Sequence, residues 1–181
     1  MKDEEWEKEV DQQELRREKI KERGDQVAKR FPILFWHYNH SRKGKIREPL
    51  NYGLEIDAGW LDLLEQLCEK LDGIAKNHGV TITALQIKEK FGTLRFYYSL
   101  KNPKTKKALS PIEVSLFSPD GGVTRMVPQA DDPVQAEINQ AIREAEAESA
   151  VTCEICGQPG ILRSGGWIRC LCDGCNVRER A

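Results

Sequence analysis

The sequence predicts an α+β fold in which a small antiparallel sheet, formed by two hairpins, packs on two helices. Two segments place apolar residues at helical spacing, and two others alternate apolar and polar residues around glycine-containing turns. The predicted helices are residues 55–79 and 131–149, and the predicted hairpins are residues 80–100 and 111–127. In addition, five of the six cysteines lie in residues 153–175, which predicts a zinc-ribbon-like module near the C-terminus.

The composition narrows the class of protein. With 181 residues, of which 31% are charged and 39% hydrophobic, the chain suits one domain with a small appendage. We divide it into a charged N-terminal arm (1–30), an α+β core (31–150) and a zinc-binding module (151–181). No apolar stretch approaches the ~20 residues needed to cross a bilayer, and the acidic N-terminus lacks the apolar segment of a secretory signal. We therefore expect a cytoplasmic protein without a membrane partner.

The arm contains nine Lys/Arg and ten Asp/Glu, with few apolar residues between them. This pattern predicts a solvated helix, exposed or stabilised by a partner, that Gly24 interrupts and Pro32 ends. The apolar residues from Phe31 onward begin the buried core. His37 and His40 follow, and they either pack locally or join the cysteines as metal ligands.

Both predicted helices carry boundary signals. Asp57 is suited to cap the start of the first helix, and Gly79 to end it in a left-handed turn. Asp132 is suited to cap the start of the second helix, and Pro133 fits its first helical position. Cys68 lies on the apolar stripe of the first helix, where we expect it to behave as a small buried hydrophobe.

The first hairpin is predicted to turn at Phe91-Gly92. With that centre, Leu85 faces Tyr98 and Ile87 faces Phe96, so the apolar faces match without a slip. The opposite face then presents polar and basic groups to solvent. These are Gln86, Lys88, Lys90, Arg95 and Tyr97. The second predicted hairpin places Gly121-Gly122 in its turn.

The cysteines near the C-terminus form two C-x-x-C pairs separated by fifteen residues. Cys153, Cys156, Cys172 and Cys175 at this spacing favour one tetrahedral zinc ion held by four thiolates. A pair of disulfides, an iron–sulfur cluster and a redox dithiol are the alternatives, and a cytoplasmic setting argues against the disulfides. A site with four protein ligands leaves no open position, so we expect the zinc to be structural. Cys170 either packs beside the site or replaces Cys172.

Residues around the pairs support this interpretation. Gly157 and Asn176 follow the first and second pair, where a left-handed turn would aim amide groups at sulfur. Four thiolates and one zinc ion carry about −2 in total, and four nearby arginines offset that charge or meet phosphates. They are Arg163, Arg169, Arg178 and Arg180.

Three stretches together resemble a group of small uncharacterised bacteriophage and prophage proteins. They are "GLEIDAGWLDLLEQLCEKL", "IKEKFGTLRFYY" and "CEICGQPGILRSGGWIRCLCDGC", within residues 31 to 177. The resemblance implies metal ligands at Cys153, Cys156, Cys172 and Cys175, leaves Cys170 out, and implies a bacterial host cell. The group's common "ECGDGW" is "EIDAGW" here. The resemblance implies a genomic context and no activity.

Three functions compete. The first is a non-catalytic, zinc-stabilised protein that acts through a protein partner, because phosphate loops, dinucleotide fingerprints and nucleophile motifs are absent from the sequence. The second is nucleic-acid binding through Lys88, Lys90, Arg95 and Tyr97, since basic and aromatic groups on one sheet face suit phosphates and bases. The third is an enzyme.

The enzyme hypothesis depends on Glu55 and Asp57. Two carboxylates placed two residues apart before a helix suit acid–base chemistry, with Lys88 and Glu89 of the hairpin nearby. A helix cap and a salt bridge are the structural alternative. We therefore lean away from catalysis.

Overall fold

The computed structural model describes the backbone of residues 2–41, 53–101, 108–109, 114–117, 123–126, 132–164 and 167–178. Side chains are described for residues 13–40, 53–101, 132–164 and 167–178. The helices are α1 (Lys2–Arg30), α2 (Trp36–Ser41), the 3-10 turn η2 (Ala58–Trp60), α3 (Leu61–His78), α4 (Pro133–Ser149) and α5 (Asp173–Arg178). The strands are β1 (Thr81–Lys90), β2 (Thr93–Lys101), β3 (Ala108–Leu109), β4 (Val114–Phe117), β5 (Val123–Met126), β6 (Ile161–Arg163) and β7 (Arg169–Leu171).

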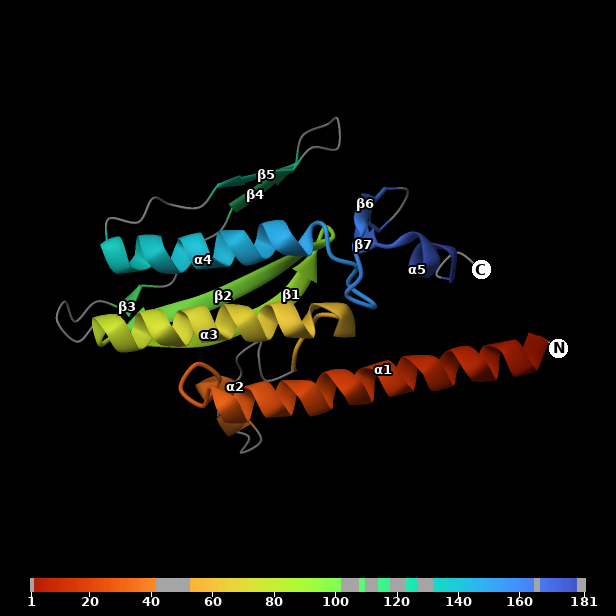
Figure 1. Cartoon of the computed structure of the whole chain (residues 1–181), viewed down its shortest axis with the longest axis horizontal. Coiled ribbons are helices and arrows are strands. Elements are labelled where there is room, and N and C mark those ends of the chain that lie inside the picture. The colour runs from red at the N-terminus through yellow and green to blue at the C-terminus, as the bar shows by residue number, and fades with distance from the viewer. Residues whose placement is uncertain are drawn as a thin grey trace.

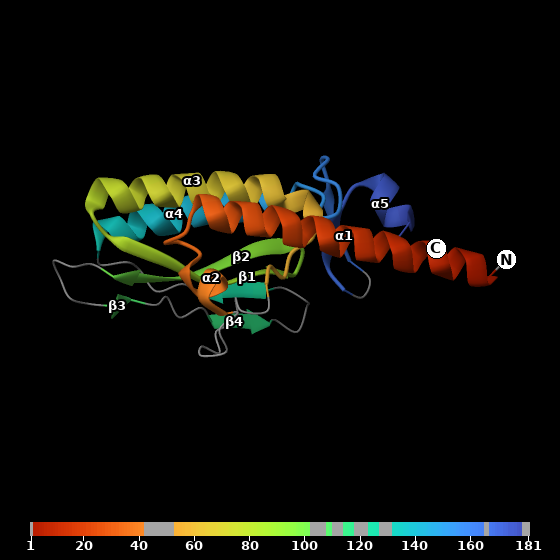
Figure 2. The ribbon, with the colours of Figure 1, turned by 90° about the horizontal axis from the view of Figure 1, so that it is seen from below.

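The architecture is α+β, as predicted. Helices α3 and α4 lie side by side on one face of the β1–β2 ribbon, and α2 lies on the opposite face (Figures 1 and 2). The first predicted hairpin belongs to the sheet β1-β2-β3, and the second forms a separate sheet, β4-β5, with Val114 opposite Met126. Its predicted glycine turn lies outside the described residues.

The β1–β2 register corrects one prediction. Ile87 faces Phe96 as expected, but Tyr98 pairs with Ala84, and a bulge at Leu85 shifts the register. The bulge has a clear physical reason. It shifts by one residue which side chains of β1 point inward, so that Ile82 and Ala84 before the bulge and Ile87 after it are all buried.

The helix boundaries confirm the capping signals. Asp57 accepts a hydrogen bond from the Ala58 amide at the start of η2, which continues into α3. Gly79 ends α3 in the left-handed conformation, with φ of 64°. Asp132 accepts from the Val134 amide at the start of α4. In the described part of the chain, no helix combines the length and apolarity that crossing a membrane requires.

Helix α1 corrects the prediction that Gly24 interrupts it. The helix is continuous to Arg30, and a Cβ at Gly24 would lie 3.0 Å from Cδ1 of Leu54, so the glycine permits close packing. Val27 and Ala28 are buried in the main core. The last turns of α1 therefore belong to the core, while its N-terminal turns extend beyond it (Figures 1 and 2).

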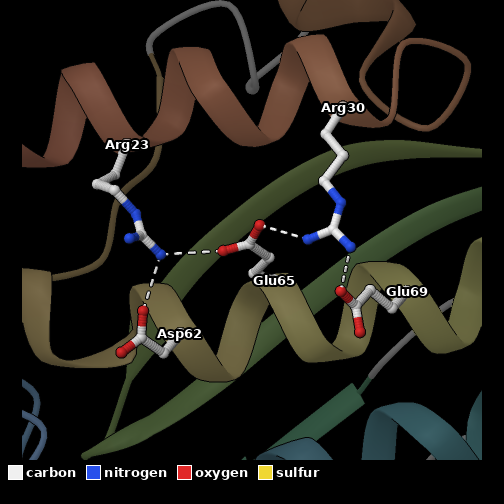
Figure 3. A network of polar contacts seen from close by, with 5 residues as sticks. All are labelled: Arg23, Arg30, Asp62, Glu65 and Glu69. Carbon is white, nitrogen blue, oxygen red and sulfur yellow. Dashed lines mark hydrogen bonds and ion pairs between the residues drawn. The ribbon is translucent and has the colours of Figure 1, made fainter.

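A row of ion pairs fixes the docked part of α1 against α3 (Figure 3). Arg23 donates to Asp62 (2.8 Å) and to Glu65 (2.9 Å). Arg30 donates to Glu65 (2.7 Å) and pairs with Glu69. Glu65 therefore joins both arginines, and the charged pattern of the arm serves intramolecular packing at this end.

Candidate metal centre

The two C-x-x-C pairs meet at one point, as predicted. Cys153 and Cys156 lie in the loop after α4, Cys172 follows β7, and Cys175 lies in α5. The antiparallel β6–β7 pair returns the chain between them. The four Sγ atoms all lie within 4.8 Å of one another, so the cluster is suited to hold a metal ion.

The distance between two of the sulfurs suits a tetrahedral ion better than a disulfide. Tetrahedral bonds of about 2.3 Å from sulfur to zinc place two sulfurs about 3.8 Å apart, and Cys156 Sγ lies 3.6 Å from Cys172 Sγ. A disulfide requires a separation of about 2.05 Å. The cysteines are free thiols in the structure.

The two ligand turns differ, which corrects one expectation. Gly157 has φ of 76° and donates its amide to the Cys153 carbonyl (2.8 Å). Asn176 is not left-handed, because the second pair lies at the start of α5 and the Asn176 amide bonds the Cys172 carbonyl in a helical turn (2.9 Å). The Cys175 amide points to Cys172 Sγ (3.4 Å).

The cysteine thiols of the cluster differ in their pKa values. The Cys175 amide lowers the pKa of the Cys172 thiol to about 7. Burial raises the pKa of Cys156 and raises that of Cys175 to about 12. A bound cation must therefore displace protons from some ligands near neutral pH, so its affinity falls as the pH falls.

Cys170 lies beside the centre and does not belong to it. Its side chain is buried, and its Sγ donates to the Ala150 carbonyl (3.3 Å). Burial raises the pKa of this thiol to about 11. Cys68 is buried in the main core, as predicted, and burial raises its pKa as well.

The module is tightly docked on the start of α3. The Gly59 amide donates to the Glu154 carbonyl (2.7 Å), and Trp60 Nε1 donates to the Thr152 carbonyl (2.8 Å). A Cβ at Gly59 would lie 2.2 Å from the Cys153 carbonyl oxygen. Only glycine permits this approach. The Gly59-Trp60 dipeptide before α3 could have signalled this contact, but the sequence analysis did not identify it.

The hairpin turn is a second docking point. A Cβ at Gly92 would lie 2.5 Å from Cδ2 of Leu162 and 3.1 Å from the backbone of Cys170. Phe91 adopts positive φ (56°) in the same turn. The metal module thus contacts both the start of α3 and the β1–β2 turn, so contacts cross the predicted boundary near residue 150.

The predicted arginines have separate partners. Arg178 Nη2 donates to Cys175 Sγ (3.3 Å), so its positive charge lies where it would offset a Cys175 thiolate. Arg163 pairs with Asp173 (2.5 Å). Arg169 pairs with Glu154 and lies 3.6 Å from Asp57. Burial raises the pKa of Glu154 although the guanidinium of Arg169 opposes the shift. Arg180 lies outside the described residues.

The hairpin face agrees only in part with expectation. Lys88 lies over the Tyr97 ring (5.5 Å) and Lys90 over the Phe91 ring (5.4 Å). Arg95 is buried instead of exposed, and its guanidinium donates to Thr93 Oγ1 (2.5 Å) and to the Leu94 carbonyl. Both bonds come from Nη1, so contacts within the fold hold this end of the guanidinium.

The histidines are not in the cysteine cluster found among the described residues. His40 stacks on Trp36 with ring centroids 3.6 Å apart. This is the local packing that the sequence analysis gave as the alternative to metal binding. The two carboxylates of the enzyme hypothesis also have partners. Glu55 accepts from Gln86 (3.0 Å), and Asp57 caps η2.

A groove of about 640 Å³ separates α1 from the metal module. Trp167, which is 77% exposed, lines it and donates its indole N–H to Glu89 (3.2 Å). Glu55, Asp57 and Arg169 also line the groove. Trp167 was not predicted as a site residue, although a tryptophan in a Ser-Gly-Gly loop between two ligand pairs was a signal.

Comparison of the chain with family models, with curated proteins and with solved structures finds no match. The geometry of the described residues therefore carries the functional argument.

Proposed function

We propose that this chain is a non-catalytic binding protein of phage or prophage type, stabilised by one structural zinc ion, that acts by contacting another protein. The distribution of exposed apolar side chains carries the proposal. Five of the eight large apolar side chains that are exposed among the described residues lie on the metal module. These are Val151, Ile161, Leu162, Trp167 and Val177. Exposed large apolar groups concentrated in one small module make that module the candidate for a protein-binding surface.

Zinc is the metal that the donors favour. Four thiolates in two knuckle turns form a closed tetrahedral set, which is the usual arrangement of a structural zinc site. Docking through Gly59 and Gly92 supports a structural role, because the ion fixes backbone that the core itself contacts. Native mass spectrometry with and without a strong chelator tests this step. One zinc per chain supports it, and iron or lost thiol hydrogens contradict it.

Trp167 is the sharpest probe of the partner surface. Aromatic residues supply most of the binding energy in many interfaces. We expect zinc-loaded protein to capture a defined partner from nuclease-treated bacterial lysate, and the purified partner to bind W167A at least ~10-fold more weakly. Leu15→Ala is the matched control, because Leu15 is also an exposed apolar residue (64%) but lies on α1.

The outcome separates the competing functions. If W167A and L15A bind the purified partner equally, the metal module is not the interface. If nuclease treatment removes all captured material, nucleic-acid binding replaces protein binding. The phage or prophage assignment rests on the resemblance of the three stretches quoted in the sequence analysis, and a partner belonging to a host system would strengthen it.

Nucleic-acid binding is the second candidate because Lys88 and Tyr97 share one sheet face, as stacking and phosphate contact require. The test is affinity for a single-stranded oligonucleotide across a salt series. A steep loss of affinity with salt in the wild type, reduced in Lys88→Met, supports it. A shallow dependence contradicts it.

A further inference from the structure

A separate pocket of about 380 Å³ lies between α2 and the hairpin β1–β2, far in sequence from the metal module. Its strand residues alternate with Ile82 and Leu100, which are buried in the main core, so the pocket lies on the face of the ribbon that points away from that core. Its volume falls within the range of small-ligand sites, about 300–1,000 Å³. None of its lining residues belongs to the surface proposed above, so the inference does not rest on that proposal.

The floor of the pocket is formed by two cross-strand pairs. Thr81 pairs with Lys101, and Thr83 with Ser99, on the face of the ribbon that points away from α3. Ile82, between the threonines, is buried in the main core on the other face. The floor therefore offers three hydroxyl groups and one ammonium. The described lining residues include no carboxylate, so their charge favours an anion.

The wall is aromatic. Trp36 and Ile33 line the pocket from the side of α2, and both are largely exposed. The Trp36 ring stacks on His40 with an interplanar angle of 23°. An indole beside polar donors favours a ligand with a planar apolar part.

His37 adds a ring nitrogen to the wall. It lines the pocket, and its Nδ1 is buried without a hydrogen-bond partner in the described part of the chain. Burying an N–H without an acceptor costs more free energy than burying a nitrogen lone pair without a donor. The neutral ring of His37 therefore carries its proton on Nε2. His37 is then a further hydrogen-bond donor on the wall beside Trp36.

From this combination we propose that the pocket binds a small organic anion with a planar ring. Its anionic group is held by Lys101 and the hydroxyls of Thr81, Thr83 and Ser99. The ring of the ligand lies against Trp36, and His37 donates a hydrogen bond to the ligand from the wall.

The test is a nuclear magnetic resonance titration of the zinc-loaded chain with phenyl phosphate, with inorganic phosphate in a parallel arm. We expect saturable amide shifts on β1 and β2 with a Kd of ~1 mM or tighter. The chain has three histidines, so the ring nitrogens of His37 can be followed individually. In the free protein Nδ1 should be unprotonated in the neutral ring, and Nε2 should shift on binding.

Two matched substitutions decide the role of the charge. Lys101→Met should weaken phenyl phosphate about tenfold or more, the effect of losing one charge-assisted hydrogen bond. Lys76→Met is the control, because Lys76 is an exposed lysine on α3, paired with Asp72. Equal affinity in the two variants, shifts that never saturate, or equal binding of inorganic phosphate would each overturn the proposal. The amide spectrum of each variant verifies that it is folded.

Discussion

Gly59→Ala tests whether the metal module and the core are built as one unit. The added Cβ would meet three backbone atoms: the Cys153 carbonyl oxygen at 2.2 Å, the Gly157 nitrogen at 2.5 Å and the Glu154 carbonyl carbon at 2.7 Å. No side chain is available to rotate away, so the backbone must separate by roughly 1 Å to reach van der Waals contact. Overpacking typically costs about 1–3 kcal/mol.

The same movement weakens the hydrogen bond from the Gly59 amide to the Glu154 carbonyl (2.7 Å). A net loss of about 1 kcal/mol for that bond brings the expected destabilisation to about 2–4 kcal/mol. Gly73→Ala is the control, because Gly73 lies within α3 and a Cβ there meets nothing within 4 Å. Better helix propensity should stabilise that variant by about 0.5–1 kcal/mol.

Two assays on zinc-loaded protein measure the effect. Urea unfolding followed by circular dichroism gives the free energies, which should change in opposite directions in the two variants. Competition with a chromogenic chelator gives the rate of zinc release, which should rise in the Gly59 variant alone. If both variants are as stable as the wild type and release zinc at its rate, the close docking described above is wrong.

Three other predictions follow from the described contacts. Tyr98→Phe removes the hydroxyl that donates to Asn139 Oδ1 (2.8 Å) in the core, and should cost about 1–3 kcal/mol in urea unfolding. Burial raises the pKa of Tyr98 to about 12, above about 10 in the unfolded chain. Its contribution to stability is therefore complete below about pH 10 and lost as the pH rises toward 12, and the phenylalanine variant should lack that decline. Glu65→Gln weakens the contacts of Arg23 and Arg30 with the carboxylate. The substitution should therefore lower the melting temperature at low salt and have little effect in about 1 M salt. An equal change of melting temperature at both salt concentrations contradicts the ion-pair role. Zinc binding should release protons near neutral pH, measured by calorimetry in buffers of different ionisation enthalpy, and a buffer-independent heat would contradict the raised pKa values of the ligand thiols.

Features that depend on a few neighbouring residues were predictable from the sequence. Asp57 and Asp132 cap helices because the carboxylate satisfies amides one or two residues later. Gly79 ends α3 because a left-handed residue is needed there and glycine adopts it without strain. The cysteine cluster was predictable for the same reason, since each C-x-x-C turn is local and the two pairs suit one metal site.

Features that depend on distant partners were not predictable. The Leu85 bulge follows from which residues of β1 the helices cover, and strict alternation gives no sign of it. Gly24 resembles a helix breaker until Leu54 is known to lie against it. Arg95 was expected in solvent because a guanidinium is rarely buried, yet it is buried and donates to Thr93 and to the Leu94 carbonyl within the fold.

The docking of the module changes what the metal does. Trp60 is fully buried in the main core, and its indole N–H is bonded to the Thr152 carbonyl just before the first ligand. Energy from the proposed metal binding would order Cys153 and, through this bond, also the start of α3. Trp167 lies in the same module and bonds Glu89 of the hairpin. The proposed ion would therefore hold the surface around Trp167 in register with the core, and we expect a partner that recognises that surface to bind only the metal-loaded chain.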